Sequence, residues 1–358
     1  MRKLILLWAL LLGFALRGQD RINVQIYGHI DYELNRYPNA KDTRNDGLGS
    51  FTLGEHDFFV TSKITEHISF LGETVITGSK SSSTGFAASI ERARLKFNYY
   101  GNHSILIGKM HTAINYWNDV YHHGRIFFPT IDRPLAFNYY VPIHALGIRA
   151  QGQNLGNLKF GYDLQVANSL ESMDASGNSL NFNYNASLHI KPVDGMRLMV
   201  GFNNDFLPSN MPGPHAHSGN VHHNHSMMYR GPVDLNQLHF SIAYFGKDWE
   251  FLNEFAYVQT RTDSLGISNS FANFTYIGYR LKSVWVPYAF ADFITMSENE
   301  LHHMPVSGLK YGMGIRYDIN DNINVKLQYE VYDRLPAAGR VMGIENKQEI
   351  KMQLAYAL

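Results

Sequence analysis

Residues 22–34 read INVQIYGHIDYEL, in which apolar and polar side chains alternate almost without a break. Alternate residues of a β-strand lie on opposite faces. One face would therefore carry Ile22, Val24, Ile26, Gly28, Ile30, Tyr32 and Leu34. Strands of globular proteins average five or six residues, whereas a tilted strand that crosses a bilayer needs about 9–11. The pattern predicts a membrane-crossing strand, with its apolar face toward lipid and its polar face toward water inside a barrel.

The same alternation recurs along the chain and predicts a transmembrane, antiparallel, up-and-down β-barrel of about sixteen strands. The strands are expected at 22–34, 54–64, 67–78, 88–100, 104–112, 144–152, 157–169, 180–191, 196–206, 233–245, 249–262, 271–280, 284–295, 309–319, 323–334 and 347–358. Between 249 and 295 apolar residues occupy both faces, and Pro287 removes a ladder donor, so fourteen and eighteen strands remain alternatives.

The connections between these strands alternate in length. Short turns rich in Asn and Gly, such as 100–102 and 320–322, occupy every second junction. Longer polar loops are expected near 35–53, 79–87, 113–143, 170–179, 207–232, 263–270, 296–308 and 335–346. Short periplasmic turns and long extracellular loops are typical of outer-membrane barrels.

The N-terminus has the form of a secretory signal peptide. Arg2 and Lys3 precede the thirteen apolar residues 4–16, which are too few to span about 30 Å of hydrocarbon as a helix. We therefore predict a cleaved signal peptide over 1–18 and one barrel domain over 19–358.

The composition agrees with a membrane barrel and excludes several other classes of protein. Aromatic residues make up 13% of the chain and charged residues only 17%, as expected for a lipid-facing surface with aromatic girdles. There is no cysteine, which excludes disulfides and thiolate chemistry. The 31 basic and 31 acidic residues cancel, so the charge gives no support for nucleic-acid binding.

The face opposite the apolar one would line the lumen. On 88–100 this face carries a cationic row of Arg92, Arg94 and Lys96. The candidate pore-lining residues are Arg92, Arg94, Lys96, Lys109, His111 and Arg316. The row is either a ladder that guides anions through the pore or a wall of charges paired with acids on neighbouring strands.

The segment 113–143 is too aromatic to extend into solvent as a loop. We expect it to fold back into the barrel and narrow it; a rigid cap over the barrel mouth is the alternative. Its candidate solute-contacting residues are Tyr116, Trp117, Tyr121, His122, His123, Arg125 and Arg133.

A second candidate site is a histidine-rich stretch in the loop 207–232. It contains His215, His217, His222, His223 and His225. Imidazole suits Zn²⁺, Cu²⁺ and Ni²⁺, so these residues are candidate ligands for a metal or its chelate. The alternative is a polar surface loop that binds metal adventitiously or responds to pH. No cofactor is otherwise required.

The chain resembles the porins of Gram-negative bacteria, particularly Bacteroidota-type porin-like proteins and the wider phosphate-selective porin group. The more specific part of the resemblance is a set of short motifs. They are Gly108-Lys109-Met110-His111, Tyr116-Trp117-Asn118, Tyr121-His122-His123-Gly124 and Ile131-Asp132-Arg133-Pro134. The C-terminal residue departs from the family, because porins typically end in Phe and this chain ends in Leu358.

The resemblance implies a non-enzymatic channel in the bacterial outer membrane for passive diffusion of small hydrophilic solutes, with anions or metal chelates as candidate solutes. Expected partners are outer-membrane lipid, such solutes or metal ions, and two further copies of the chain in a homotrimer. One alternative is a receptor that captures metal through its histidine-rich loop. Another is an enzyme on the barrel rim, although neither a Gly-x-Ser-x-Gly motif nor a His-Glu-x-x-His motif is evident.

Replacing all five histidines of the 207–232 loop with serine is expected to abolish most Zn²⁺ or Cu²⁺ binding without lowering heat stability. An external loop contributes no ladder hydrogen bonds, so it loses ligands but no packing. Binding should also weaken below about pH 6, since protonated imidazole cannot coordinate a metal. Calorimetry at two pH values measures both effects. Equal binding by wild type and variant, or none tighter than about 100 µM in either, would leave only a polar surface loop.

Overall fold

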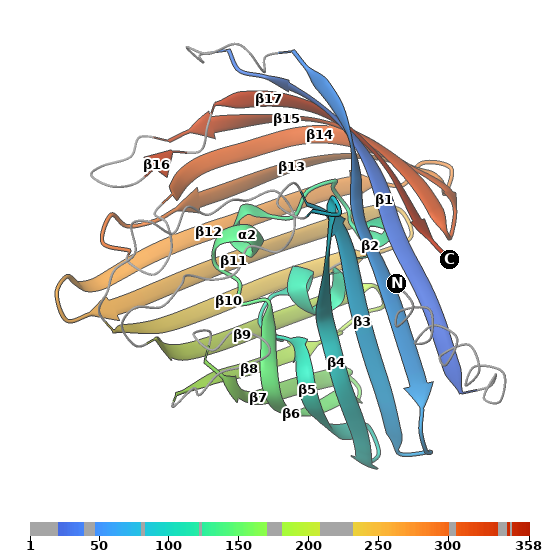
Figure 1. The fold of residues 1–358 in the computed structure, drawn as a ribbon, viewed down its shortest axis with the longest axis vertical. Coiled ribbons are helices and arrows are strands. Elements are labelled where there is room, and N and C mark those ends of the chain that lie inside the picture. Colours follow the sequence, from blue (N-terminus) through green and yellow to red (C-terminus); the bar gives the residue numbers. More distant parts are fainter. Residues whose placement is uncertain are drawn as a thin grey trace.

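The computed structural model of the chain describes residues 21–38, 47–79, 83–121, 124–169, 181–207, 232–300, 306–335, 342–343 and 346–358. Within these ranges the chain forms a closed antiparallel β-barrel of sixteen strands, as the sequence predicts. The strands are strongly tilted and surround the short helix α2 (Leu135–Tyr139) (Figure 1).

The barrel strands follow one another around the wall in sequence order. They are β1 (Ile22–Arg36), β2 (Gly49–Lys63), β3 (Ile68–Gly78), β4 (Phe86–Tyr100), β5 (His103–His111), β6 (His144–Leu155), β7 (Phe160–Asn168), β8 (Phe182–Ile190), β9 (Met196–Leu207), β10 (Val233–Phe245), β11 (Trp249–Thr262), β12 (Gly266–Tyr279), β13 (Trp285–Thr295), β14 (Val306–Asn320), β15 (Ile323–Arg334) and β17 (Lys347–Ala357). The two-residue strand β16 (Met342–Gly343) pairs in parallel with the start of β14 and lies outside this count.

Pairing between the first and last strands closes the barrel. β1 pairs with β17 over ten residue pairs, from Tyr27 opposite Ala357 to Arg36 opposite Gln348. β1 also pairs with β2 on its other side, with a bulge between Gly28 and Ile30. Each barrel strand of the described chain therefore has a neighbour on both sides, and no strand is left as a free edge in the bilayer.

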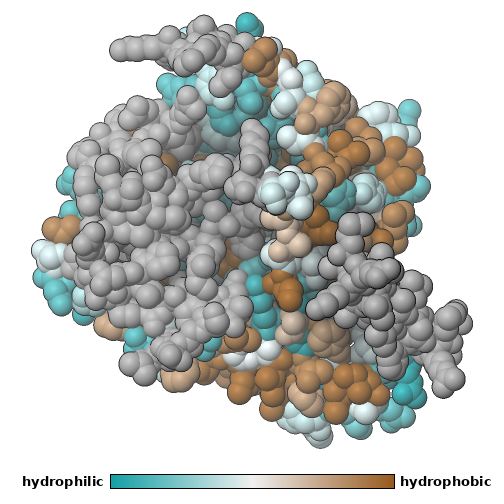
Figure 2. All heavy atoms as spheres, viewed as in Figure 1, coloured by the Kyte–Doolittle hydropathy of each residue, from teal (hydrophilic) through white to brown (hydrophobic). Residues whose placement is uncertain are grey.

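The two faces of the strands separate as the alternation predicts. Outward-facing Leu188 and Leu327 are 47% and 49% exposed, whereas Asn183 and Gln328 on the inward face are 1% exposed. Figure 2 shows apolar side chains on the outer surface of the strands on the right and at the lower edge of the view. The outer surface is therefore apolar and the lumen wall mainly polar.

The inner face of β10–β13 is an exception to this separation. Leu235, Val258 and Ile294 point inward and are fully buried, and they pack against Leu135 and Tyr140 of the segment 113–143. Apolar residues occupy both faces of these strands because one face meets lipid and the other meets the inserted segment. This packing explains the irregular alternation between 249 and 295.

The structure differs from the prediction at the connection between β11 and β12, and it places Pro287 within a strand. The connection over 263–270 is shorter than predicted, because β12 begins at Gly266 and continues the ladder with β11. Pro287 lies within β13 opposite Ile315 of β14. The pairing of β13 with β12 begins at Tyr288, one residue after the proline, so the missing N–H does not interrupt that ladder.

In the described part of the chain, no α-helix combines the length and the apolar character that a membrane crossing requires.

Replacing Leu327, near the middle of β15, with arginine should lower the free energy of unfolding by about 2–4 kcal/mol. The cost arises because the guanidinium would face hydrocarbon. The matched control Ile319→Arg, at the end of β14, should cost only about 0–1 kcal/mol, since it lies near the membrane interface. Urea titrations in lipid vesicles measure both values, and equal costs at the two positions would contradict the assigned outward face.

Candidate functional site: the barrel lumen

The segment between β5 and β6 lies inside the barrel. It contains a π-helical turn (Trp117–Tyr121), a 3-10 turn (Arg125–Phe127) and α2. Its contacts reach β2, β9, β10, β11, β13, β14, β15 and β17. The segment therefore crosses the lumen and does not form a cap over the mouth.

Polar side chains of the wall satisfy backbone groups of this irregular segment. The Trp117 amide donates to Oε1 of Glu254 at 3.0 Å, and the Leu135 amide donates to Oδ2 of Asp292 at 2.7 Å. Lys326 donates from Nζ to the Arg125 carbonyl at 2.6 Å. Such partners are needed because a buried segment with little helix has few internal hydrogen bonds of its own.

Glu55 of β2 anchors the segment through two arginines. Arg133 donates to both carboxylate oxygens of Glu55, at 2.9 and 2.8 Å, and Arg125 lies 3.4 Å from the same carboxylate. Arg133 and Glu55 are both buried. A bidentate pair of this kind is strong and directional, and breaking one partner leaves a buried charge.

A second anchor joins the segment to β15 and β17. The Lys351 ammonium lies 2.6 Å from Asp132 of the segment, 2.8 Å from Glu330 and 2.9 Å from Glu349. These three carboxylates are close enough to hold a metal ion. The Lys351 ammonium lies among them, so these residues form an ion-pair network.

Asp119 forms a third anchor, 2.6 Å from the Arg197 guanidinium of β9. Burial alone would raise the pKa of Asp119. The neighbouring Arg197 and Arg149 outweigh that effect and hold the pKa below its usual value. The carboxylate is therefore ionised at neutral pH, and the pair holds the π-helical turn against the wall.

The predicted constriction residues are mostly packed rather than presented to a solute. Trp117 is fully buried against Phe128 and Phe274, and its ring also contacts Tyr121. Tyr116 is buried, and Arg125 and Arg133 are paired with Glu55 as described. His122 and His123 lie outside the described residues.

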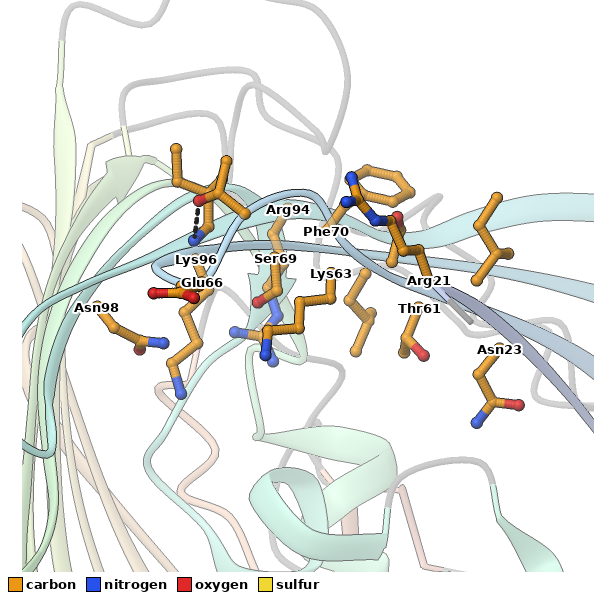
Figure 3. A pocket seen from close by; sticks show the side chains of 15 residues that line it. Arg21, Asn23, Thr61, Lys63, Glu66, Ser69, Phe70, Arg94, Lys96 and Asn98 are labelled. Carbon is orange, nitrogen blue, oxygen red and sulfur yellow. Dashed lines mark hydrogen bonds between the residues drawn. The ribbon is translucent and has the colours of Figure 1, made fainter. Parts of the chain in front are cut away.

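The cationic row on β4 divides into two parts. Arg92 forms an ion pair with Glu73 of β3 and covers the ring of Phe59. Arg94 and Lys96 instead line a cavity of about 640 Å³ at the short-turn end of the barrel (Figure 3). Arg92 thus has the surroundings of a paired wall charge, whereas Arg94 and Lys96 face the cavity and form no ion pair within the described residues.

The other candidate pore-lining residues have different surroundings. Arg316 pairs with Glu250 at 2.7 Å and with Asp318 at 2.9 Å. His111 is buried, with its ring 5.3 Å from that of His144.

Lys109 was predicted to line the pore, but its side chain does not lie on the inner face of β5. It follows the register of outward-facing Ile105 and Ile107 and donates to the Ile90 carbonyl. The irregular backbone at Gly108 (φ 130°) precedes it. The structure thus places Lys109 on the outward register.

Sequence reasoning did not single out Lys63, which also lines the cavity. The sequence could have indicated this position, because Lys63 has the same strand parity as Glu55 and Asp57, two acids that are buried on the inner wall. The five histidines at 215, 217, 222, 223 and 225 lie outside the described residues, so their metal binding stays a prediction.

Comparisons with known proteins support the fold. No family model matches the chain, and no curated protein matches its sequence. An anion-selective porin from Comamonas acidovorans superposes with a TM-score of 0.63 at 12% identity, over 94% of this chain and 100% of that one. The outer-membrane channel DcaP of Acinetobacter baumannii gives 0.64 at 10% identity, over 94% and 97%.

OmpT, an outer-membrane protein of Vibrio cholerae in a trimer form, gives a TM-score of 0.61 at 12% identity, over 95% of this chain and 100% of that one. At these identities the likeness shows the fold. The chain is a closed antiparallel β-barrel of sixteen strands with the fold of these outer-membrane proteins.

Replacing Glu55 with alanine should lower the free energy of unfolding by roughly 3–5 kcal/mol, because Arg133 and Arg125 would remain buried without their carboxylate. The control Asp194→Asn removes the exposed partner of Lys159 and should leave the stability unchanged, since solvent screens that pair. Urea titration of the purified barrel measures both. A Glu55→Ala barrel as stable as wild type would show that the segment does not depend on this anchor.

Proposed function

We propose that the chain is a channel for passive diffusion of small hydrophilic solutes across the outer membrane, with a preference for anions. The observation that carries the proposal is the closed barrel with a polar inner wall, on which Arg94 and Lys96 face a cavity. Charges that line a narrow lumen select ions, because low-dielectric walls reduce their screening. The similarity to an anion-selective porin and to the DcaP channel supports the same function.

Metal chelates are the alternative solutes, and capture of metal by the histidine-rich loop is the alternative function. The described carboxylate cluster of Asp132, Glu330 and Glu349 does not favour metal binding, because the Lys351 ammonium already lies at ion-pair distance from all three groups. No specific observation favours an enzyme. The finer resemblance to Bacteroidota-type and phosphate-selective porins stays part of this proposal and depends on the motifs between 108 and 134.

A homotrimer is the assembly we propose, supported by the trimer form of the similar OmpT barrel. Mass measurement of the detergent-solubilised complex tests it, and a monomer at every concentration would contradict it.

The channel function predicts discrete conductance steps when the purified protein is added to a planar bilayer. Replacing Arg94 and Lys96 together with glutamine should lower the ratio of anion to cation permeability, because two lumenal positive charges are lost. The reversal potential in a salt gradient measures this ratio.

The matched control is Arg92→Gln combined with Glu73→Gln, which removes an ion pair without changing the net charge and should leave the ratio unaltered. Conductance with a wild-type reversal potential in the Arg94/Lys96 variant would exclude anion selection by these residues. No conductance at all would favour a receptor over a channel.

A further inference from the structure

Three cationic side chains of the strands line the cavity at the short-turn end of the barrel, and Arg21 lines it beside them. Lys63 ends β2, and Arg94 and Lys96 lie on β4. Ser69 of β3 pairs with Lys63 on one side and with Lys96 on the other, so Lys63 and Lys96 lie in one row across three strands. Arg94 lies two residues before Lys96 on the same face of β4. Figure 3 shows the side chains of Lys63, Arg94 and Lys96 on the same side of the sheet, directed toward the inserted segment. We call Lys63, Arg94 and Lys96 the cationic cluster.

The cluster differs from most other cations of the described lumen in its lack of acidic partners. Most lumenal cations elsewhere have a carboxylate at ion-pair distance, as is found for Arg92, Arg125, Arg133, Arg197, Arg316, Lys310 and Lys351. Lys326 is an exception, and it donates instead to the Arg125 carbonyl and to Oε1 of Gln353. Within the described residues the cluster forms no ion pair, and Nε of Arg94 is buried without a hydrogen-bond partner. Glu66, on the turn between β2 and β3, is the one acidic residue that lines the cavity.

This arrangement carries an electrostatic cost. Like charges on one face of a partly enclosed cavity repel, and low-dielectric surroundings strengthen the repulsion. A bound anion would relieve it and accept hydrogen bonds from the ammonium and guanidinium groups. Neutral donors stand beside the cations, since Ser69 and Asn98 line the same cavity.

We propose that the cationic cluster is a binding site for small oxyanions that carry two or more negative charges, at the periplasmic mouth of the lumen. Three cations favour a polyvalent over a monovalent anion, because each charge of the ligand can pair with a separate side chain. The cavity of about 640 Å³ is much larger than one such ion, so the anion binds with part of its water shell. The role of the site in transport rests on the proposed channel function, whereas anion binding itself does not.

Calorimetry with sodium sulfate on the detergent-solubilised barrel tests the site. The triple variant Lys63→Gln, Arg94→Gln and Lys96→Gln should bind sulfate at least tenfold more weakly than wild type. The matched control changes Lys159, Lys247 and Lys282 to Gln, which are exposed lysines on short turns at the same end of the barrel. It loses the same charge and should bind sulfate within about twofold of wild type, because these three lysines do not line the cavity. If the triple variant does not fold, Lys96→Gln alone should weaken sulfate binding by severalfold.

Nitrate serves as the monovalent comparison and should compete with sulfate only at far higher concentration. Three results would each contradict the proposed site. They are competition by nitrate at the same concentration as sulfate, equal loss of sulfate binding in the cluster and control variants, and no sulfate binding by wild type. Conductance is measured on the same samples. Conductance without sulfate binding would support the proposed channel and contradict the proposed site. Sulfate binding without conductance would support the site and contradict the channel.

Discussion

The structure depends on one constraint, which is that every backbone N–H and C=O group within the bilayer must be paired by the protein itself. The pairing of β1 with β17 meets this constraint by removing the last free edge. Once the sheet is closed, each strand has a lipid face and a lumen face, and the period-two alternation of the sequence follows directly. The same closure creates the enclosed space that holds the inserted segment and the cavity lined by Arg94 and Lys96.

The inserted segment extends the constraint into the lumen. Its backbone has little regular structure, so side chains of the wall such as Glu254 and Asp292 accept hydrogen bonds from its amide groups. Carboxylates and ammonium groups then fix its charged residues, as Glu55 does for Arg133. Much of the lumenal charge is used in this way for structure. Charge available for a solute is confined to places without such partners, and this is why the cationic cluster stands out.

The sequence was sufficient to predict the fold but only part of the site. Alternation specifies which face of a strand meets lipid, so strands such as β10 and β11 were predicted with the bounds that the structure shows. The inner apolar face of β10–β13 obscured the pattern, because its partner is a distant segment that alternation cannot identify. The cationic row on β4 was evident from parity. The separation of Arg92 from Arg94 and Lys96 was not, because it depends on Glu73 of the neighbouring strand and on the register between the two strands.

The anchors of the inserted segment also bear on how the barrel forms. Asp132 contacts Lys351, 219 residues later in the chain, and Arg125 contacts Lys326, 201 residues later. Glu55, in contrast, precedes Arg133 by 78 residues. The segment thus joins early and late parts of the chain, and its final position exists only after the C-terminal strands are in place. Contacts of such long sequence separation form slowly, because the entropy of closing the intervening loops is lost first. A segment synthesised in the first half of the chain thus reaches its place in the lumen only together with strands of the second half, as does β1 when it pairs with β17.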